Sequence, residues 1–144
     1  MLRPVFMRRA LRPLICRRGA AMVEFAVVAP IFFLMVLGMF EFGRAMMVQA
    51  LLTNAAQQGA RAGSLDGAQA SDVTAAVNSY LAAGGISGAT STATPSPPSS
   101  ALPGSDVTVQ VSIPYSSVSW LPAPSYLANA TLSSTAIAKR ETGQ

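Results

Sequence analysis

Hydrophobic residues fill residues 20–40 almost without interruption, and Glu24 is the single charged residue among these 21. A helix rises about 1.5 Å per residue, so this stretch covers roughly 30 Å, the thickness of the hydrocarbon core of a bilayer. It can be a buried core helix, a cleaved secretory signal or a transmembrane helix. The chain after Phe40 holds few large apolar residues to cover a core helix, and residues 41–45 make a poor signal-peptidase site. The pattern therefore favours a retained transmembrane helix.

The helical pattern continues beyond this stretch, because residues 41–63 keep apolar and small side chains at intervals of three and four. These positions are Met46, Met47, Ala50, Leu51, Asn54 and Ala55. Ala55, Gly59 and Gly63 follow one another at a spacing of four, which lets another helix approach closely. Alanine is also simply the best helix former. We expect one helix over residues 20–62, with these three small residues as its helix-packing face.

Turn and capping residues predict a second helix at the start of residues 64–144. A turn over residues 63–67 precedes Ser71 and Asp72, either of which can cap a helix, and Gly84-Gly85 can end it. The apolar stripe of this helix is Val73, Ala76, Val77, Tyr80 and Leu81.

Alternating apolar and polar residues predict two strands. Residues 106–115 place four β-branched residues on one face, and in residues 130–138 Leu132 alternates with small residues. Residues 87–105 are rich in Ser, Thr and Pro and predict a mobile low-complexity loop, in which residues 90–94 can form a short edge strand. The expected fold class is α+β, with a long N-terminal helix, a second helix and a short antiparallel sheet.

A group of large apolar residues lies between the two strands, in a segment punctuated by prolines: Val118, Trp120, Leu121, Tyr126 and Leu127. They either anchor this loop in the core or form an exposed patch for a partner. We favour the anchor and keep the patch as the alternative.

The net charge of +4 is positive because of the first 19 residues, which carry +6, whereas the rest of the chain sums to −2. Six arginines precede Gly19 and no acid does, whereas the rest of the chain carries four positive and six negative side chains. Residues 1–19 therefore predict a basic cytoplasmic leader that sets the N-terminus inside and the C-terminal domain outside. An amphipathic helix on anionic lipid is the alternative, but Pro4 and Pro13 interrupt it. The charge gives no reason to expect nucleic-acid binding.

The chain lacks the residue types of most catalytic and metal sites. It contains no histidine, and its only cysteine, Cys16, lies in the leader, so no intramolecular disulfide can form. No phosphate-binding loop, metal-ligand cluster or nucleophile-base pair is evident. We expect no enzyme activity, no cofactor and no small-molecule substrate.

The first residues of the apolar stretch resemble a class III, prepilin-type signal: a basic leader, Gly19, Ala20, then Glu24 and Phe25. Residues 17–63 resemble the TadE-like family of tight-adherence pilus assembly proteins, which share this opening, a proline such as Pro30, and a segment like Asn54–Ala62. Where the family usually has a charged pair, this chain has Gln57 and Gln58.

The resemblance implies a minor pseudopilin of a Flp-type pilus, in the bacterial inner membrane with a periplasmic or extracellular C-terminal domain. It implies cleavage by a prepilin peptidase between Gly19 and Ala20, with Glu24 and Phe25 as recognition and assembly contacts. The implied partners are the bilayer, other pilins and pseudopilins, an inner-membrane platform, a secretion ATPase and the peptidase.

Glu24 itself has two interpretations. It is either an acid that reaches the cytoplasmic interface or the partner of a positive group, such as the α-ammonium that cleavage would create at Ala20 of a neighbouring subunit. Two functions other than pilus assembly remain: a generic signal-anchored periplasmic protein that binds an envelope partner, and a membrane-bound enzyme or sensor.

Overall fold

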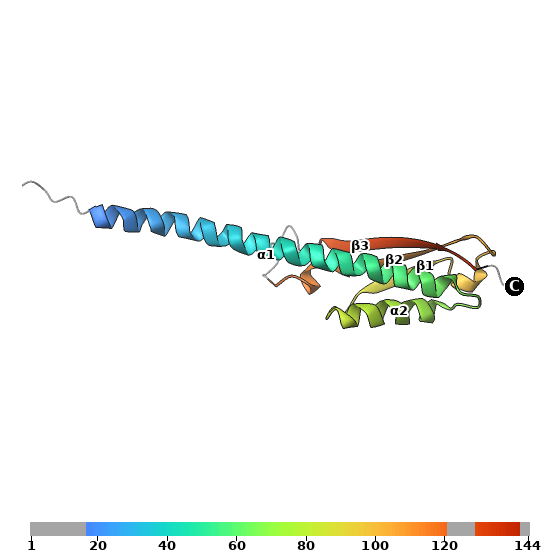
Figure 1. Ribbon diagram of the computed structural model, residues 1–144. Helices are drawn as coiled ribbons and strands as arrows, with labels where there is room; N and C mark the ends of the chain where they lie inside the picture. The colour runs from blue at the N-terminus through green and yellow to red at the C-terminus, as the bar shows by residue number, and fades with distance from the viewer. Residues whose placement is uncertain (1–16, 121–128, 142–144) are drawn as a thin grey trace, which may run out of the picture. The chain divides into compact units, whose positions relative to one another are not determined.

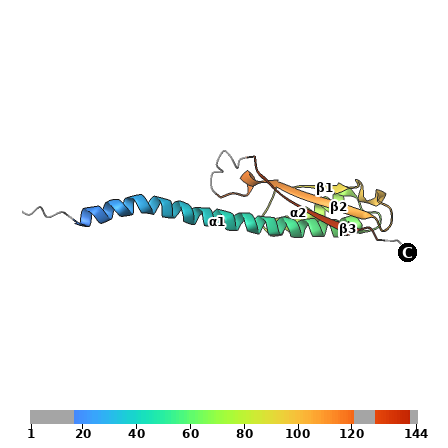
Figure 2. The same cartoon turned by 90° about the horizontal axis from the view of Figure 1, so that it is seen from above.

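The computed structural model describes residues 17–120 and 129–141, and these form two helices, two short 3-10 turns and three strands (Figures 1 and 2). The chain divides into two units, Met1–Leu37 and Gly38–Gln144. The first unit holds the N-terminal part of helix α1. The second holds the rest of α1 and every other described element. Most of the predicted leader lies outside the described residues, as does Cys16.

Helix α1 (Arg17–Ser64) is the long helix that the pattern predicts, and it extends two or three residues beyond the predicted ends. Pro30 lies inside it. Proline removes one backbone hydrogen bond from a helix, and membrane helices tolerate it better than soluble ones. After α1 the chain turns through Gly67, whose φ of +76° is available to glycine at little cost.

Helix α2 (Ala70–Ala83) confirms the second predicted helix, but the predicted cap is wrong. The N-cap is Gln69, and Asp72 lies in the first turn, where its carboxylate accepts a hydrogen bond of 2.8 Å from the Gln69 backbone N–H. Asp72 therefore satisfies a free N–H from inside the helix. At the other end Gly85, with φ of +71°, lets the Ile86 N–H reach the Leu81 carbonyl at 2.9 Å.

The sheet is antiparallel in the order β1 (Thr90–Thr94), β2 (Asp106–Pro114) and β3 (Thr131–Lys139). In its register Val109 of β2 lies between Ala93 of β1 and Ala136 of β3. Both predicted strands and the short edge strand are confirmed. Together with the two helices they confirm the α+β class.

Both helices cover the same face of the sheet, so the core of the second unit is a single layer (Figure 2). The buried side chains of α1 and α2 meet the apolar face of β2 there, while the other face of the sheet is mostly polar and also carries the exposed Ile137. The largest fully buried side chains are Leu52, Leu81, Ile113, Val48, Val73, Val77, Val107, Val109, Val111 and Pro98.

The Ser/Thr/Pro segment 87–105 contains more regular structure than its composition predicts. It includes β1 and the 3-10 turn η1 (Pro98–Ser100), and Pro98 is buried. The Ser99 N–H donates to the carbonyl of Ala68 at 3.1 Å, which ties η1 to the turn after α1. The burial of Pro98 and the long-range hydrogen bond of Ser99 depend on tertiary contacts, which composition does not reveal.

Candidate functional site

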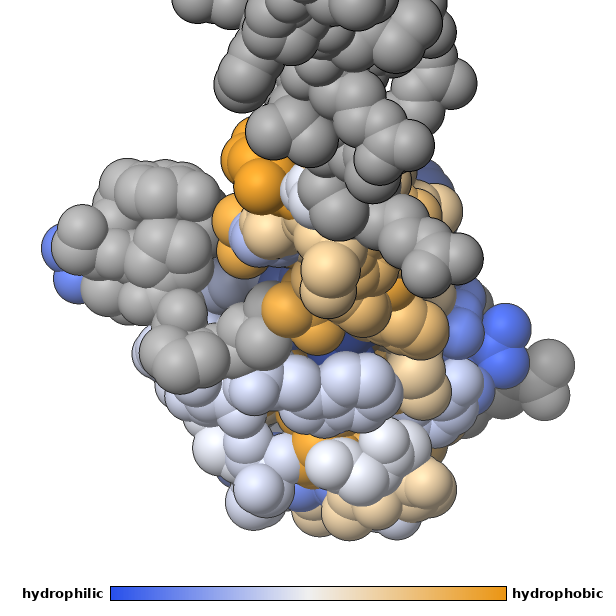
Figure 3. All heavy atoms as spheres, turned by 90° about the vertical axis from the view of Figure 1, so that its left-hand side faces the viewer, coloured by the Kyte–Doolittle hydropathy of each residue, from blue (hydrophilic) through white to orange (hydrophobic). Residues whose placement is uncertain are grey.

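The apolar half of α1 exposes its large side chains on all sides. α1 is the one helix in the described ranges that is long and apolar enough to cross a membrane, and none of its most apolar 18-residue stretch is buried. The exposed residues include Met22, Val23, Phe25, Val27, Val28, Ile31, Phe32, Phe33, Leu34, Met35 and Phe40. Figure 3 shows hydrophobic side chains exposed on the surface. A helix of this kind fits a single-pass membrane anchor.

The predicted processing residues lie at the start of this helix. Gly19, Ala20, Glu24 and Phe25 are all exposed, and the Glu24 carboxylate has no hydrogen bond or ion pair with another described residue. A Cβ atom placed on Gly19 would meet no atom within 4 Å, and the helix needs no positive φ there. Neither packing nor backbone conformation accounts for a glycine at position 19.

The small residues predicted as a helix-packing face point into the core of the second unit. A Cβ atom on Gly59 would lie 2.7 Å from Val77 Cγ2 of α2 and 3.1 Å from Val109 Cγ1 of β2. On Gly63 it would lie 3.1 Å from Val73 Cγ2. Ala55 is fully buried. Within the unit this face of α1 is thus occupied by α2 together with β2.

The sequence interpretation did not predict a cluster of contacts at the beginning of the second unit. Glu41 and Arg44, in the first turn after the apolar stretch, hold the segment that follows β2. The Tyr115 hydroxyl donates to Glu41 Oε1 at 2.8 Å, and the backbone N–H of Trp120 donates to Glu41 Oε2 at 3.4 Å. Arg44 Nε donates to the Val118 carbonyl at 3.4 Å, and its guanidinium lies 5.2 Å from the centre of the Trp120 ring.

The anchor predicted for the segment between the strands is confirmed at Val118, and nothing in the structure tests the alternative of a partner patch. Val118 is buried in the core, whereas the Trp120 side chain is 70% exposed. Leu121, Tyr126 and Leu127 lie outside the described residues. The signal that could have indicated the cluster is the pair Glu41 and Arg44, charged residues three apart that directly follow an uncharged stretch.

Burial, the hydrogen bond to Glu41 and the negative charge of Glu41 together raise the pKa of Tyr115 above its usual 10.0. The unfolded chain then loses the phenol proton at a lower pH than the folded chain, so the stability from this site is present below pH 10.0 and is lost as pH rises through the folded pKa. We expect Tyr115→Phe to lose less stability than the wild type when the pH is raised above 10.0. The measurement is the urea midpoint of both proteins between neutral pH and high pH; equal losses would contradict it.

Arg140, the first residue after β3, ties this segment to the turn after α1. Its guanidinium donates to the carbonyls of Ser99 and Ala101, and its Nη2 lies 2.7 Å from Asp66 Oδ1. The Arg140 side chain is only 14% exposed, and its Nε is buried without a hydrogen-bond partner among the described residues. The Glu141 N–H adds a bond of 2.9 Å to the Ser64 carbonyl.

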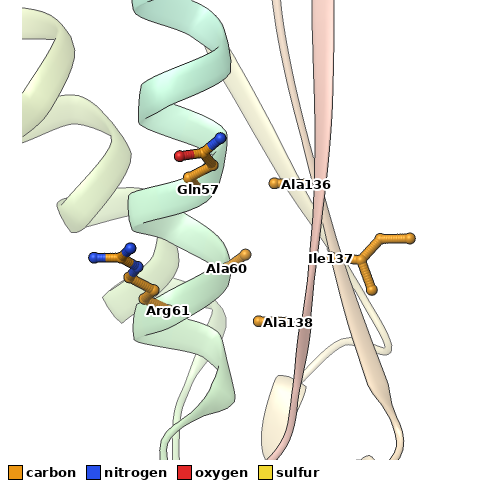
Figure 4. Close-up of a pocket in the computed structure, with 6 residues that line it drawn as sticks. All are labelled: Gln57, Ala60, Arg61, Ala136, Ile137 and Ala138. Carbon is orange, nitrogen blue, oxygen red and sulfur yellow. The ribbon is translucent and has the colours of Figure 1, made fainter.

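One shallow groove lies between α1 and the edge strand β3 (Figure 4). Ala136 and Ala138 point toward α1 and Ile137 points away, so the walls carry one cation, one amide and methyl groups. Its lining residues are Gln57, Ala60, Arg61, Ala136, Ile137 and Ala138. These groups do not include a nucleophile, a general base or a metal ligand set. Within the described ranges no group of three or more His, Cys, Asp or Glu residues is placed to hold a metal ion.

Comparison with known proteins identifies one segment. Residues 19–61 match the family described as TadE-like protein. This range begins at Gly19, contains Glu24 and ends inside the small-residue face, so the resemblance to this family is confirmed over the segment where the sequence motifs lie. No curated protein and no solved structure matches the chain.

Proposed function

From the TadE-like identity of residues 19–61, we propose that this chain is a minor pseudopilin-like membrane protein that takes part in assembly of a tight-adherence, Flp-type pilus. Proteins of this family are associated with pilus assembly and are not enzymes. The observation that carries the proposal is the exposed apolar half of α1, which bears a single acid five residues after a glycine. A membrane anchor alone needs the apolar residues but neither the glycine nor the acid.

The proposed topology follows the arginines of the leader. The N-terminus lies in the cytoplasm, residues 20–40 cross the inner membrane and the second unit lies in the periplasm or outside the cell. The proposed partners are the bilayer, other pilins and pseudopilins, the inner-membrane platform and the prepilin peptidase.

We expect the peptidase to cut between Gly19 and Ala20, which would account for a glycine that packing does not require. N-terminal sequencing of the membrane-extracted protein should yield Ala20 in cells with an active prepilin peptidase and Met1 in cells without it. Gly43→Ala serves as the matched control, because a Cβ there also meets no atom within 4 Å. Gly19→Val should abolish the cut, whereas Gly43→Ala should not. An intact Met1 in cells with active peptidase would remove the claim.

The alternative is a generic signal-anchored protein that binds an envelope partner through its second unit. Both functions predict an inserted helix, so insertion does not separate them. Deletion of the gene separates them, because pilus assembly predicts loss of surface pili and their return with the wild-type gene. Normal piliation in the deletion strain would favour the alternative.

A further inference from the structure

The cluster around Glu41 sets the position of Trp120 along the axis of α1. Phe40 is the last residue of the apolar stretch, and Glu41 and Arg44 occupy the next turn, which spans about 5 Å of helix. Both bind the segment 115–120, through Tyr115 and Trp120 for Glu41 and through Val118 for Arg44. A residue far away in the sequence is thereby held level with the turn at which the hydrocarbon-crossing stretch ends.

The side chains at this level have the chemistry of a membrane–water interface. Trp120 is exposed although Val118, two residues earlier, is buried, so the core does not need the indole ring. Tryptophan is enriched at the headgroup level because its ring is apolar and its N–H is polar. Arg44 lies over that ring as a cation. The same two turns of α1 carry three exposed apolar side chains, those of Phe42, Met46 and Met47.

We propose that Trp120 and Arg44 form a second contact with the bilayer, in which the indole enters the interface and the guanidinium meets lipid phosphate. This inference rests on the proposed membrane-spanning helix. The bilayer is the favoured occupant because Glu41 and Arg44 directly follow Phe40, the last residue of the apolar stretch, along α1 and because Arg44 complements anionic phosphate. The Glu41 carboxylate, which lipid phosphate would repel, already accepts hydrogen bonds from the Tyr115 hydroxyl and from the backbone N–H of Trp120.

This contact gives the second unit a defined orientation. A helix that crosses a bilayer can still rotate about its own axis and tilt. A tryptophan on a separate segment, bound to one face of α1, restricts both motions because rotation would move the indole out of the interface. The second unit is then presented to its neighbours in one orientation.

The experiment uses Trp120 as the probe, because it is the only tryptophan in the chain. The full chain is reconstituted in phosphatidylcholine vesicles, with bromine atoms either near the glycerol end or near the terminal end of the acyl chains. We expect blue-shifted emission, stronger quenching by the bromine near the glycerol end, and weak quenching by iodide in the water. Arg44→Gln should weaken the lipid quenching.

A matched control moves the tryptophan to the other end of the same unit. Leu65 is already exposed and directly follows Ser64, the last residue of α1, which lies 23 residues and about 35 Å beyond Glu41 along the helix. Trp120→Phe combined with Leu65→Trp should show iodide quenching and no bromolipid quenching.

Two outcomes overturn the inference. If Trp120 behaves like the Leu65→Trp control while the protein floats with the vesicles, the lipid contact is wrong and the membrane helix stands. If Trp120 becomes shielded only in membranes that contain the assembled pilus system, its partner is a protein and the lipid contact is again wrong. Failure to float would instead remove the membrane helix, and with it the proposed function.

Discussion

Replacing Gly59 by leucine is expected to unfold the second unit or leave it close to unfolding. The first added atom alone would lie 2.7 Å from Val77 Cγ2 and 3.1 Å from Val109 Cγ1, and both valines are fully buried and β-branched. Such side chains have few other rotamers to adopt. Overpacking of this kind costs about 1–3 kcal/mol and sometimes more, whereas the gain in helix propensity over glycine is about 1 kcal/mol. A small domain has few kcal/mol to lose.

A comparison of two alanine variants tests whether close contacts at position 59 cause the loss of stability. Gly59→Ala should lower the free energy of unfolding, because the contact distance outweighs the propensity gain, whereas Gly43→Ala should raise it by about 0.5–1 kcal/mol. A Cβ on Gly43 meets no atom within 4 Å. Urea unfolding of the full chain in detergent, followed by circular dichroism, measures both. Equal stabilisation by the two alanines would show that the close approach of α1 and α2 is not required.

Replacing Glu24 by alanine is expected to leave insertion intact and to reduce the number of surface pili. An ionised side chain in a bilayer costs up to about 2.5–3.5 kcal/mol, so its removal cannot impair insertion. What is lost is a negative charge with no partner among the described residues, which we propose meets the new α-ammonium of a neighbouring subunit. If this pair contributes about 1.4 kcal/mol, co-assembly weakens about tenfold.

Two further variants separate charge from side-chain volume. Glu24→Gln keeps the size and should resemble Glu24→Ala, whereas Val23→Ala removes an exposed neighbour in the same turn and should behave as wild type. Pili are counted by electron microscopy, and insertion is measured by carbonate extraction. Unchanged pilus density in Glu24→Ala would contradict the assembly role of the acid.

Local patterns were sufficient for the secondary structure because they repeat at short range. The apolar residues 20–40, with Glu24 as their only charge, indicate a membrane helix, and the alternation in residues 106–115 indicates β2 and its buried face. The glycine and the acid five residues apart are likewise adjacent in sequence, so the TadE-like resemblance was visible there. Composition alone, by contrast, did not predict the regular structure in residues 87–105.

The tertiary structure alone decided which distant groups meet. Periodicity shows which face of an element is apolar, but it does not show what covers that face, so the contact of Gly59 with Val77 and Val109 was not predictable. Polar pairs carry even less signal: Glu41 and Tyr115 are 74 residues apart, as are Asp66 and Arg140. The long apolar helix, which fits a membrane anchor, is therefore a property of the sequence. The side of that helix on which Trp120 lies is set by hydrogen bonds that only the folded chain brings together.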